Sequence, residues 1–225
     1  MVAWNERFVD RETAGIALGE ALKKHELRPP VVVLGLPRGG VLVAFQVALA
    51  LGAPLDVMVV RKVGAPDQPE LAIGAMAAGD VIVHEPRMAA YLAGQDVPFE
   101  QLVQRERGEL LRRERAYRAN LPPLALGGKT AVLVDDGVAT GCTMLAAVRA
   151  ARKAAAAWVI AAAPVASHEA ADLIGGEADE TVFLNIPIDL HAISLWYRNF
   201  DQTEDGEVCE LLGKSRQAGP TSASR

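Results

Sequence analysis

Short, largely apolar runs alternate along the chain with segments whose apolar residues recur at helical spacing. The runs are bounded by glycine, proline or charged residues, as is typical of buried strands in a parallel sheet. They cover residues 31–36, 56–60, 131–134, 158–164 and 180–184. A shorter apolar stretch at residues 82–84 predicts one more strand.

Helices are predicted in most of the intervals between these strands. Their expected starts are at Arg11, Gly40, Thr140, Ser167 and Asp201. Residues 98–118 mix arginines with glutamates and predict a solvated, ion-paired helix, and residues 85–92 predict a short one. Four strand-helix repeats predict an α/β fold with a doubly wound parallel sheet, which gathers the loops at one edge.

Two adjacent acids, Asp135 and Asp136, come directly after the apolar run at residues 131–134. In an open α/β sheet, this carboxyl end of a strand is where ligands bind. Carboxylates accept hydrogen bonds from sugar hydroxyls and also position Mg²⁺. The pair predicts a site for a sugar or a magnesium ion. A strand that simply ends in two exposed acids and a turn is the alternative.

The loop after the acids is suited to an anion. Gly137, Ala139 and Gly141 have small side chains that let the backbone close on a bound group, and Thr140 and Thr143 add hydroxyl donors. Because a helix follows, the loop presents unpaired N–H groups at a helix N-terminus, which favours phosphate. The acids and the loop together predict a sugar-phosphate site.

Two further loops follow predicted strands. The sequence LPRGG at residues 36–40 connects a strand to a helix, and Arg61-Lys62 follows the run at residues 56–60. Cations at the end of one strand, where another strand ends in acids, suit a ligand with several phosphate charges. The alternatives are an ordinary turn that uses glycine for positive φ at LPRGG, and a solvated strand end at Arg61-Lys62.

The string AVLVDDGVATGCT at residues 131–143 resembles the phosphoribosyl-pyrophosphate motif of the type I phosphoribosyltransferases. The resemblance covers about residues 31–184. It implies that Asp135 and Asp136 bind the ribose hydroxyls and that the loop binds the 5′-phosphate. The loop residues so implied are Val138, Ala139, Thr140, Gly141, Cys142 and Thr143. Hypoxanthine-guanine enzymes carry an aspartate where this chain has Ala139, which argues against a purine-6-oxo mechanism.

The same resemblance implies a pyrophosphate site and a cofactor. The pyrophosphate-binding residues would be Leu36, Pro37, Arg38, Gly39, Gly40, Arg61 and Lys62. Mg²⁺ would be held by Asp135 and Asp136 through water and bound phosphoribosyl pyrophosphate. Catalytic roles are expected of Asp135, Asp136 and Lys62. No residue stands out in the sequence as the general base.

One domain is expected over residues 1–213, and the polar residues 214–225 are expected to form a disordered tail. The resemblance implies a flexible flap at about residues 63–85 and a hood built from parts of residues 1–30 and 185–213. In these transferases the hood supplies the base pocket, often by aromatic stacking. The candidate rings are Trp196, Tyr197 and Phe200. Packing of each ring onto the sheet is the alternative.

Composition narrows the class of protein. Hydrophobic residues make up 51% of the 225 residues, which is ample for a core, and no apolar stretch approaches the length of a membrane span. The N-terminus lacks the order of a signal peptide, so a cytoplasmic protein without a membrane partner is expected. A net charge of −5 gives no general attraction to nucleic acid. With two cysteines, a disulfide framework or cysteine zinc site is not expected, and Cys142 is expected to be reduced.

The sequence therefore predicts a Mg²⁺-dependent phosphoribosyltransferase. It would transfer the 5-phosphoribosyl group from phosphoribosyl pyrophosphate to an unidentified nitrogenous base and release pyrophosphate. The alternative is a regulator of the same fold that binds phosphoribosyl pyrophosphate or a nucleotide without turnover. A general phosphosugar or nucleotide hydrolase is a third class, but the sequence has no metal-binding histidine cluster. The family often forms dimers, so a homodimer is a further possibility.

Overall fold

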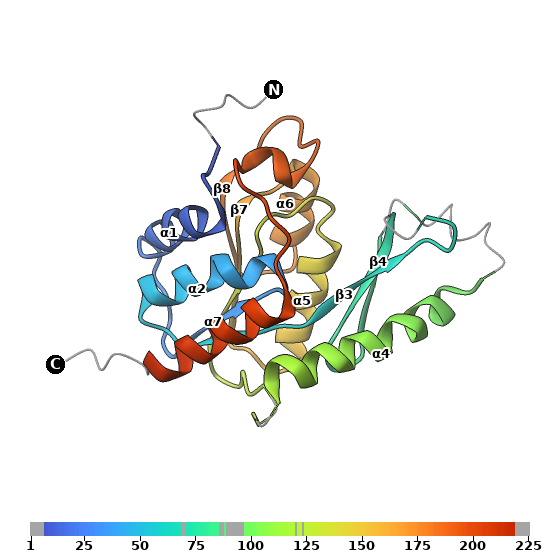
Figure 1. The fold of residues 1–225 in the computed structure, drawn as a ribbon, viewed down its shortest axis with the longest axis horizontal. Coiled ribbons are helices and arrows are strands. Elements are labelled where there is room, and N and C mark those ends of the chain that lie inside the picture. Colours follow the sequence, from blue (N-terminus) through green and yellow to red (C-terminus); the bar gives the residue numbers. More distant parts are fainter. Residues whose placement is uncertain are drawn as a thin grey trace.

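The computed structural model describes residues 7–68, 71–85, 88, 97–119, 121–122 and 124–218. At its centre lies a parallel sheet of five strands in the order β2-β1-β6-β7-β8 (Figure 1). These strands are β1 (Val31–Gly35), β2 (Leu55–Val57), β6 (Thr130–Val134), β7 (Trp158–Val165) and β8 (Glu180–Asn185). The chain goes from β1 to β2 on one side and resumes at β6 on the other, so the strand order reverses between β1 and β6. The predicted α/β fold with a doubly wound parallel sheet is confirmed.

Helices cover both faces of this sheet, as its continuously apolar strands require. One face carries α1 (Arg11–Leu22) and α2 (Gly39–Leu51), with α7 (Asp205–Ala218) beside α2, and the other carries α5 (Cys142–Lys153) and α6 (His168–Gly175). α1 begins where predicted, because the Asp10 carboxylate accepts a hydrogen bond from the Thr13 N–H (2.8 Å). No helix in the described part of the chain is long and apolar enough to cross a membrane.

Three antiparallel strands form a second sheet. They are β3 (Val60–Gly64), β4 (Ala72–Ala77) and β5 (Val81–His84), with β4 in the middle. The sheet packs against α5 and against α4 (Phe99–Arg118). In Figure 1 it extends with α4 away from the parallel sheet. α5 therefore packs on both sheets, and the loop that precedes it lies where the two sheets meet.

The prediction of one strand at residues 56–60 is wrong, because these residues belong to two strands in different sheets. β2 ends at Val57 and pairs with β1, whereas β3 begins at Val60 and pairs with β4. Met58 and Val59 between them are each 2% exposed, so the run stays apolar while the chain passes from one sheet to the other. Arg61 and Lys62 consequently lie within β3 and not at the carboxyl end of a parallel strand.

The segment expected as a flap, residues 63–85, is largely built into the second sheet. The side chains of Ile73, Ala75 and Met76 are at most 1% exposed, and β4 is hydrogen-bonded to a strand on each side. The strand predicted at residues 82–84 is confirmed as β5. The mobility of the segment stays a prediction, and the short helix predicted at residues 85–92 falls largely outside the described residues.

The first described residues lie against the segment that follows β8. The Phe8 N–H donates to the Trp196 carbonyl (2.9 Å), and the Arg198 N–H donates to the Phe8 carbonyl (2.9 Å). Trp196 ends the short 3-10 helix η3 (Ile193–Trp196), and it packs with Tyr197 against residues of α1 and β7. The first described residues and the segment after β8 thus lie side by side near the carboxyl edge of the parallel sheet, and a hood built from them stays a prediction.

Residues 214–218, expected in a disordered tail, are the last turns of α7, which ends at Ala218. Two contacts of polar side chains accompany this extension: Lys214 pairs with Glu210 (2.7 Å), and Arg216 donates to the Tyr117 carbonyl of α4 (3.3 Å). The absence of apolar residues did not exclude a helix because neighbouring polar groups supply the contacts. Residues 219–225 fall outside the described part of the chain.

Gly74 of β4 provides a test of the packing of the second sheet. A Cβ at this position would lie 2.5 Å from the Val83 carbonyl oxygen and 2.7 Å from Cζ of Phe99. Gly74→Ala is therefore expected to lower the free energy of unfolding by about 1–3 kcal/mol. Gly108 of α4 is the matched control, because no atom beyond its own helix lies within 4 Å of its Cβ position.

Gly108→Ala is expected to raise the free energy of unfolding by about 0.5–1 kcal/mol, since alanine loses less backbone entropy in a helix. Urea unfolding of both variants measures the two effects. A Gly74→Ala variant as stable as the wild type would contradict the close packing of β4 against Val83 and Phe99.

Candidate functional site

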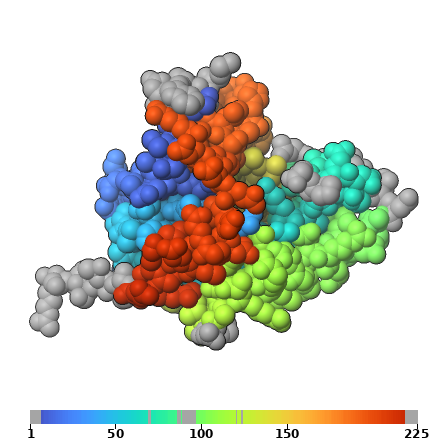
Figure 2. Space-filling model, in the orientation of Figure 1, coloured from blue at the N-terminus to red at the C-terminus, as the bar shows by residue number. Residues whose placement is uncertain are grey.

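A pocket of about 900 Å³ opens at the carboxyl edge of β1 and β6, where the strand order reverses. Figure 2 shows this region between the orange segment after β8 and the blue-green second sheet, with yellow atoms of the loop after β6 visible between them. Each loop predicted to bind ligand contributes to the lining: Pro37, Arg38, Gly39, Arg61, Lys62, Asp135, Asp136, Val138, Ala139, Thr140, Gly141 and Thr143. The fold therefore brings the three sequence-distant segments into one pocket.

The two acids after β6 have different surroundings. The carboxylate of Asp136 accepts a hydrogen bond from Nε of Arg11 (2.7 Å), a residue of the first turn of α1. The carboxyl group of Asp135 accepts the Asp136 N–H (2.9 Å), and among the described residues no cation forms an ion pair with it. Burial, and next the negative charge of Asp136, raise the pKa of Asp135 well above its usual range, while that N–H and Lys62 oppose the rise.

The LPRGG loop is pressed against the acids. A Cβ on Gly39 would lie 2.0 Å from Oδ2 of Asp136, and a Cβ on Gly40 would lie 2.8 Å from Cα of Asp135. Neither glycine has positive φ, so the turn interpretation that required positive φ is wrong. These positions need glycine because any side chain would collide with the acids. The loop is joined to the motif directly, since the Leu36 N–H donates to the Val134 carbonyl (2.8 Å).

The loop after the acids is fixed by the junction of β7 and α6. The hydroxyl of Ser167 donates to the Ala139 carbonyl (2.7 Å) and accepts the Ala170 N–H (3.0 Å), so one side chain caps α6 and anchors the loop. Gly141, with φ of 85°, leads into α5. The N–H of Cys142 reaches the Thr140 hydroxyl at 3.5 Å. The loop therefore presents a helix N-terminus to the pocket, as an anion site requires.

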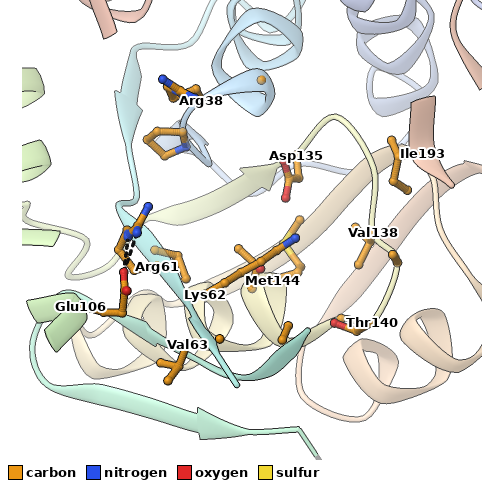
Figure 3. Close-up of a pocket in the computed structure, with 18 of the residues that line it drawn as sticks. Arg38, Arg61, Lys62, Val63, Glu106, Asp135, Val138, Thr140, Met144 and Ile193 are labelled. Carbon is orange, nitrogen blue, oxygen red and sulfur yellow. Dashed lines mark hydrogen bonds and ion pairs between the residues drawn. The ribbon is translucent and has the colours of Figure 1, made fainter. Parts of the chain in front are cut away.

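The predicted cations line the pocket from β3, across from the acids, and from the LPRGG loop. Figure 3 shows Lys62 extending across the pocket toward Asp135, whereas Arg61 turns toward α4. Nε and Nη2 of Arg61 both donate to Oε2 of Glu106 (3.0 and 2.5 Å). Arg38 also lines the pocket. The positive wall is thus formed by the LPRGG loop and β3 together.

α4 is more than the solvated helix that its charges predicted. Its apolar side is buried at Phe99, Leu102, Val103, Leu110 and Tyr117. Glu106 and Arg113 lie on this same side by helical spacing, and they line the pocket together with Arg105. The interrupted apolar stripe was a signal of this packing, but the sequence did not indicate what the stripe packs against. The packing of α4 places Glu106 beside Arg61, the residue predicted to bind pyrophosphate.

One of the three candidate rings lines the pocket, and that ring is Phe200. Trp196 and Tyr197 are 7% and 3% exposed and pack against α1 and β7. The Tyr197 hydroxyl donates to the backbone carbonyl of Asp136 (2.5 Å), and its ring lies 5.0 Å from that of Phe200. Trp196 and Tyr197 thus lie in packed positions, whereas Phe200 lines the pocket, and stacking of a base on it stays a prediction.

Three buried residues of the predicted loops, Leu36, Gly40 and Cys142, are not among the residues that line the pocket. Leu36 and Cys142 are each 1% exposed. The Cys142 thiol donates to Oε2 of Glu85 (2.9 Å). The side chains of Leu36 and Cys142 hold the loops in place from behind.

Arg11, Ser167 and Ile193 were not predicted from the sequence as residues of the site. A signal existed for Arg11: a cation in the first turn of a helix opposes the helix dipole, so its presence indicates another constraint. Ser167 was recognised only as the start of α6. Ile193 lies against Gly137, whose Cβ would be 2.4 Å from the Ile193 side chain, and no local pattern indicated this contact.

Asp135 and Asp136 were also predicted to hold a magnesium ion, and their surroundings can be compared with what Mg²⁺ requires. Within the described ranges, no group of three or more histidine, cysteine, aspartate or glutamate residues could hold a metal ion by itself. Mg²⁺ needs no such cage, because it is usually bound by one or two carboxylates and keeps water and substrate oxygens as its remaining ligands. The two carboxylates in the pocket, with one of them carrying a raised pKa, fit a cation that arrives with a phosphate ligand.

Comparison with known proteins identifies the family of this fold and pocket. The family model for the phosphoribosyl transferase domain matches residues 11–186. The chain therefore belongs to the phosphoribosyl transferase family, and the resemblance seen in the sequence is confirmed.

Two groups of relatives add detail. A protein found in two strains of Mycobacterium tuberculosis and provisionally named a phosphoribosyl transferase is 41% identical over 210 residues, which are 93% of this chain and 47% of that protein. The chain thus spans about half the length of the curated relatives it matches. The crystal structure of TT1426 from Thermus thermophilus is 44% identical, with a TM-score of 0.76, and the match covers 92% of this chain and 98% of that one.

The variant Asp135→Asn tests how much the neighbouring charges of Asp135 and Asp136 lower the free energy of unfolding. The amide has nearly the same shape but no charge, so it removes the repulsion by Asp136 and the burial of an ionised group. The expected result at pH 8 is a higher free energy of unfolding than that of the wild type, by about 1.4 kcal/mol for each unit by which folding raises the pKa.

The increase in the free energy of unfolding of Asp135→Asn over the wild type depends on pH. A raised pKa penalises the folded state where the unfolded carboxyl is ionised, so the gain should shrink toward zero as the pH falls to about 4. Urea unfolding at pH 4.5 and pH 8 measures it. Asp172→Asn, on the exposed side of α6, is the control and should change stability by less than about 0.5 kcal/mol. A loss of stability for Asp135→Asn at pH 8 would contradict the raised pKa.

Proposed function

We propose that this protein is a Mg²⁺-dependent phosphoribosyltransferase. A nitrogen of the acceptor base attacks C1 of phosphoribosyl pyrophosphate, the bond from C1 to the pyrophosphate oxygen breaks, and its electron pair leaves with pyrophosphate. The base nitrogen then loses its proton. The transition state has oxocarbenium character, so catalysis consists mainly of positioning and charge stabilisation.

The contact between the LPRGG loop and the acid pair is the observation that carries this proposal. Gly39 and Asp136 are so close that a single methyl group would not fit between them. A ligand in this pocket would meet the carboxylates proposed to bind ribose and the loop proposed to bind pyrophosphate at once, which suits a ribose that carries pyrophosphate on C1, next to its hydroxyl groups. The pocket of about 900 Å³ is large enough for such a ligand together with an acceptor.

Each group has a role in this reaction. Asp135 and Asp136 orient the ribose hydroxyls, and the backbone of residues 138–143 at the start of α5 binds the 5′-phosphate. Lys62, which points toward Asp135, and Arg38 offset the charge that builds on the leaving pyrophosphate. Arg61 contributes to the same wall while it is bound to Glu106.

Asp135 and Asp136 would hold Mg²⁺ together with water and oxygens of phosphoribosyl pyrophosphate. When bound, Mg²⁺ supplies neutralisation of the pyrophosphate charge. Phe200 provides an apolar surface for the acceptor base.

Phosphorus NMR tests the proposal. The protein is mixed with Mg²⁺ and phosphoribosyl pyrophosphate, first alone and then with each member of a panel of purine, pyrimidine and nicotinic bases. Release of pyrophosphate with one base is the expected result, and it names the acceptor. Ligand signals that shift without release for any base would instead favour the non-catalytic regulator, and unperturbed signals would contradict a phosphoribosyl-pyrophosphate site.

Asp135→Asn links turnover to the acid pair. An amide oxygen accepts a hydrogen bond from a ribose hydroxyl more weakly than a carboxylate does. The rate of pyrophosphate release is therefore expected to fall by at least about 100-fold. Asp172→Asn serves again as the control and should retain the wild-type rate. Turnover unchanged in Asp135→Asn, in protein that unfolds at the expected urea concentration, would refute the assigned role.

A further inference from the structure

Arg11 lies outside every loop of the phosphoribosyl-pyrophosphate site, yet three of its contacts are made to groups around the pocket. Nε donates to Oδ2 of Asp136 (2.7 Å), Nη1 donates to the Asp201 carbonyl (2.8 Å), and the guanidinium carbon lies 3.8 Å from the centre of the Phe200 ring. The residue is 8% exposed. It therefore bridges an acid of the aspartate motif and the segment that carries the pocket-lining ring.

Arg11 occupies a position that is unfavourable for a cation by itself. The first turn of a helix carries the positive end of the helix dipole, and a nearly buried guanidinium loses hydration that must be replaced. The Asp136 carboxylate, the Asp201 carbonyl and the face of Phe200 replace it. All of these partners are supplied by the pocket and the segment after β8. A helix that only covered the sheet would not provide them, and a buried arginine in its first turn would then be unfavourable.

The contact with Asp136 is sterically confined. The Cβ position of Gly39 is 2.7 Å from Nε of Arg11 and 2.0 Å from Oδ2 of Asp136, so the ion pair is wedged against the LPRGG loop. The pair uses one carboxylate oxygen, Oδ2. Tyr197 holds the backbone of the same acid through its hydroxyl (2.5 Å). The carboxylate of Asp136 is thereby kept in one orientation.

The contact with Phe200 is fixed by the same guanidinium. Stacking on a ring and donation to a carbonyl beside it both require a flat group with several donors, which lysine lacks. Asp201 follows Phe200 directly, so one side chain sets the position of the ring and of the backbone next to it. Movement of Asp136 and movement of Phe200 are consequently linked.

We propose that Arg11 is a positioning residue that holds the ribose acid Asp136 and the aromatic wall at Phe200 in one arrangement, so that the sugar site and the acceptor site are built together. The inference rests on the proposed transferase function for its kinetic consequences. Its structural part concerns the ligand-free protein and is independent of turnover.

Hydrogen exchange in the ligand-free protein tests the structural part. The N–H groups of Arg198 and Asn199 donate to the carbonyls of Phe8 and Val9 (2.9 Å each), next to Phe200. In Arg11→Met these two amides are expected to exchange about tenfold faster than in the wild type, because the segment loses its anchor. The control is Arg149→Met, which removes an arginine that pairs with Glu177 on the surface and has a 44% exposed side chain. It should leave both amides unchanged.

Binding and steady-state kinetics test the functional part. Arg11→Lys retains a charge for Asp136 but loses the stacking on Phe200, so KM for the acceptor should rise about tenfold while the Kd for Mg²⁺-phosphoribosyl pyrophosphate changes less than about threefold. Arg11→Met should weaken both, with kcat/KM lowered about 100-fold. A purely structural role would reduce the amount of folded protein and leave both constants of the folded fraction unchanged.

The outcomes separate this inference from the proposed function. If the wild type releases no pyrophosphate with any base, the transferase proposal fails, and faster exchange in Arg11→Met with slow exchange in Arg149→Met still supports the coupling. Wild-type exchange at Arg198 and Asn199 in folded Arg11→Met overturns the inference. Equal changes of the acceptor KM and the phosphoribosyl-pyrophosphate Kd in Arg11→Lys also overturn the inference. Such a result would mean that the contact of Arg11 with Phe200 and its contact with Asp136 do not act separately.

Discussion

The site depends on one crowded contact, in which the Asp136 carboxylate lies between the guanidinium of Arg11 and the backbone of Gly39. A carboxylate this close to a second acid is stable only if a cation offsets its charge, and the loop reaches it only where there is no side chain. The contact therefore joins the strand end, the LPRGG loop and the first helix. It also makes the two acids unequal, since Asp136 has a cation beside it and Asp135 has a raised pKa.

The second constraint is the position of α5 between two sheets. Its buried residues are mostly alanine, valine and leucine, and those small side chains allow the second sheet to pack close to the helix. Because the loop predicted to bind phosphate begins this helix, the sheet that packs on α5 brings β3 and Lys62 to the opposite side of the pocket. A helix rich in alanine thus helps to place a cation across from the acids, although no alanine takes part in binding.

Several parts of this arrangement could be predicted because they depend on neighbours in the sequence. Asp135-Asp136 and the loop to Thr143 form a strand-loop-helix unit whose geometry follows from apolar periodicity and small residues, and the helix at Asp10 follows from its capping residues. Arg61 and Lys62 were placed wrongly because the run predicted as one strand at residues 56–60 contains parts of two strands. Burial on both faces makes two successive strands look like one, and nothing local marks where the chain changes sheets.

By itself the sequence determined the family, the parallel α/β class and the loops that carry charge, because strand ends and helix starts are local features. Only the tertiary structure decided that Arg11 serves Asp136, that Glu106 holds Arg61, and that Phe200 lines the pocket while Trp196 and Tyr197 are packed away from it. Each of these outcomes joins residues that are far apart along the chain. Such pairings are set by how helices and sheets pack in three dimensions, and the pattern of one segment contains no information about its distant partner.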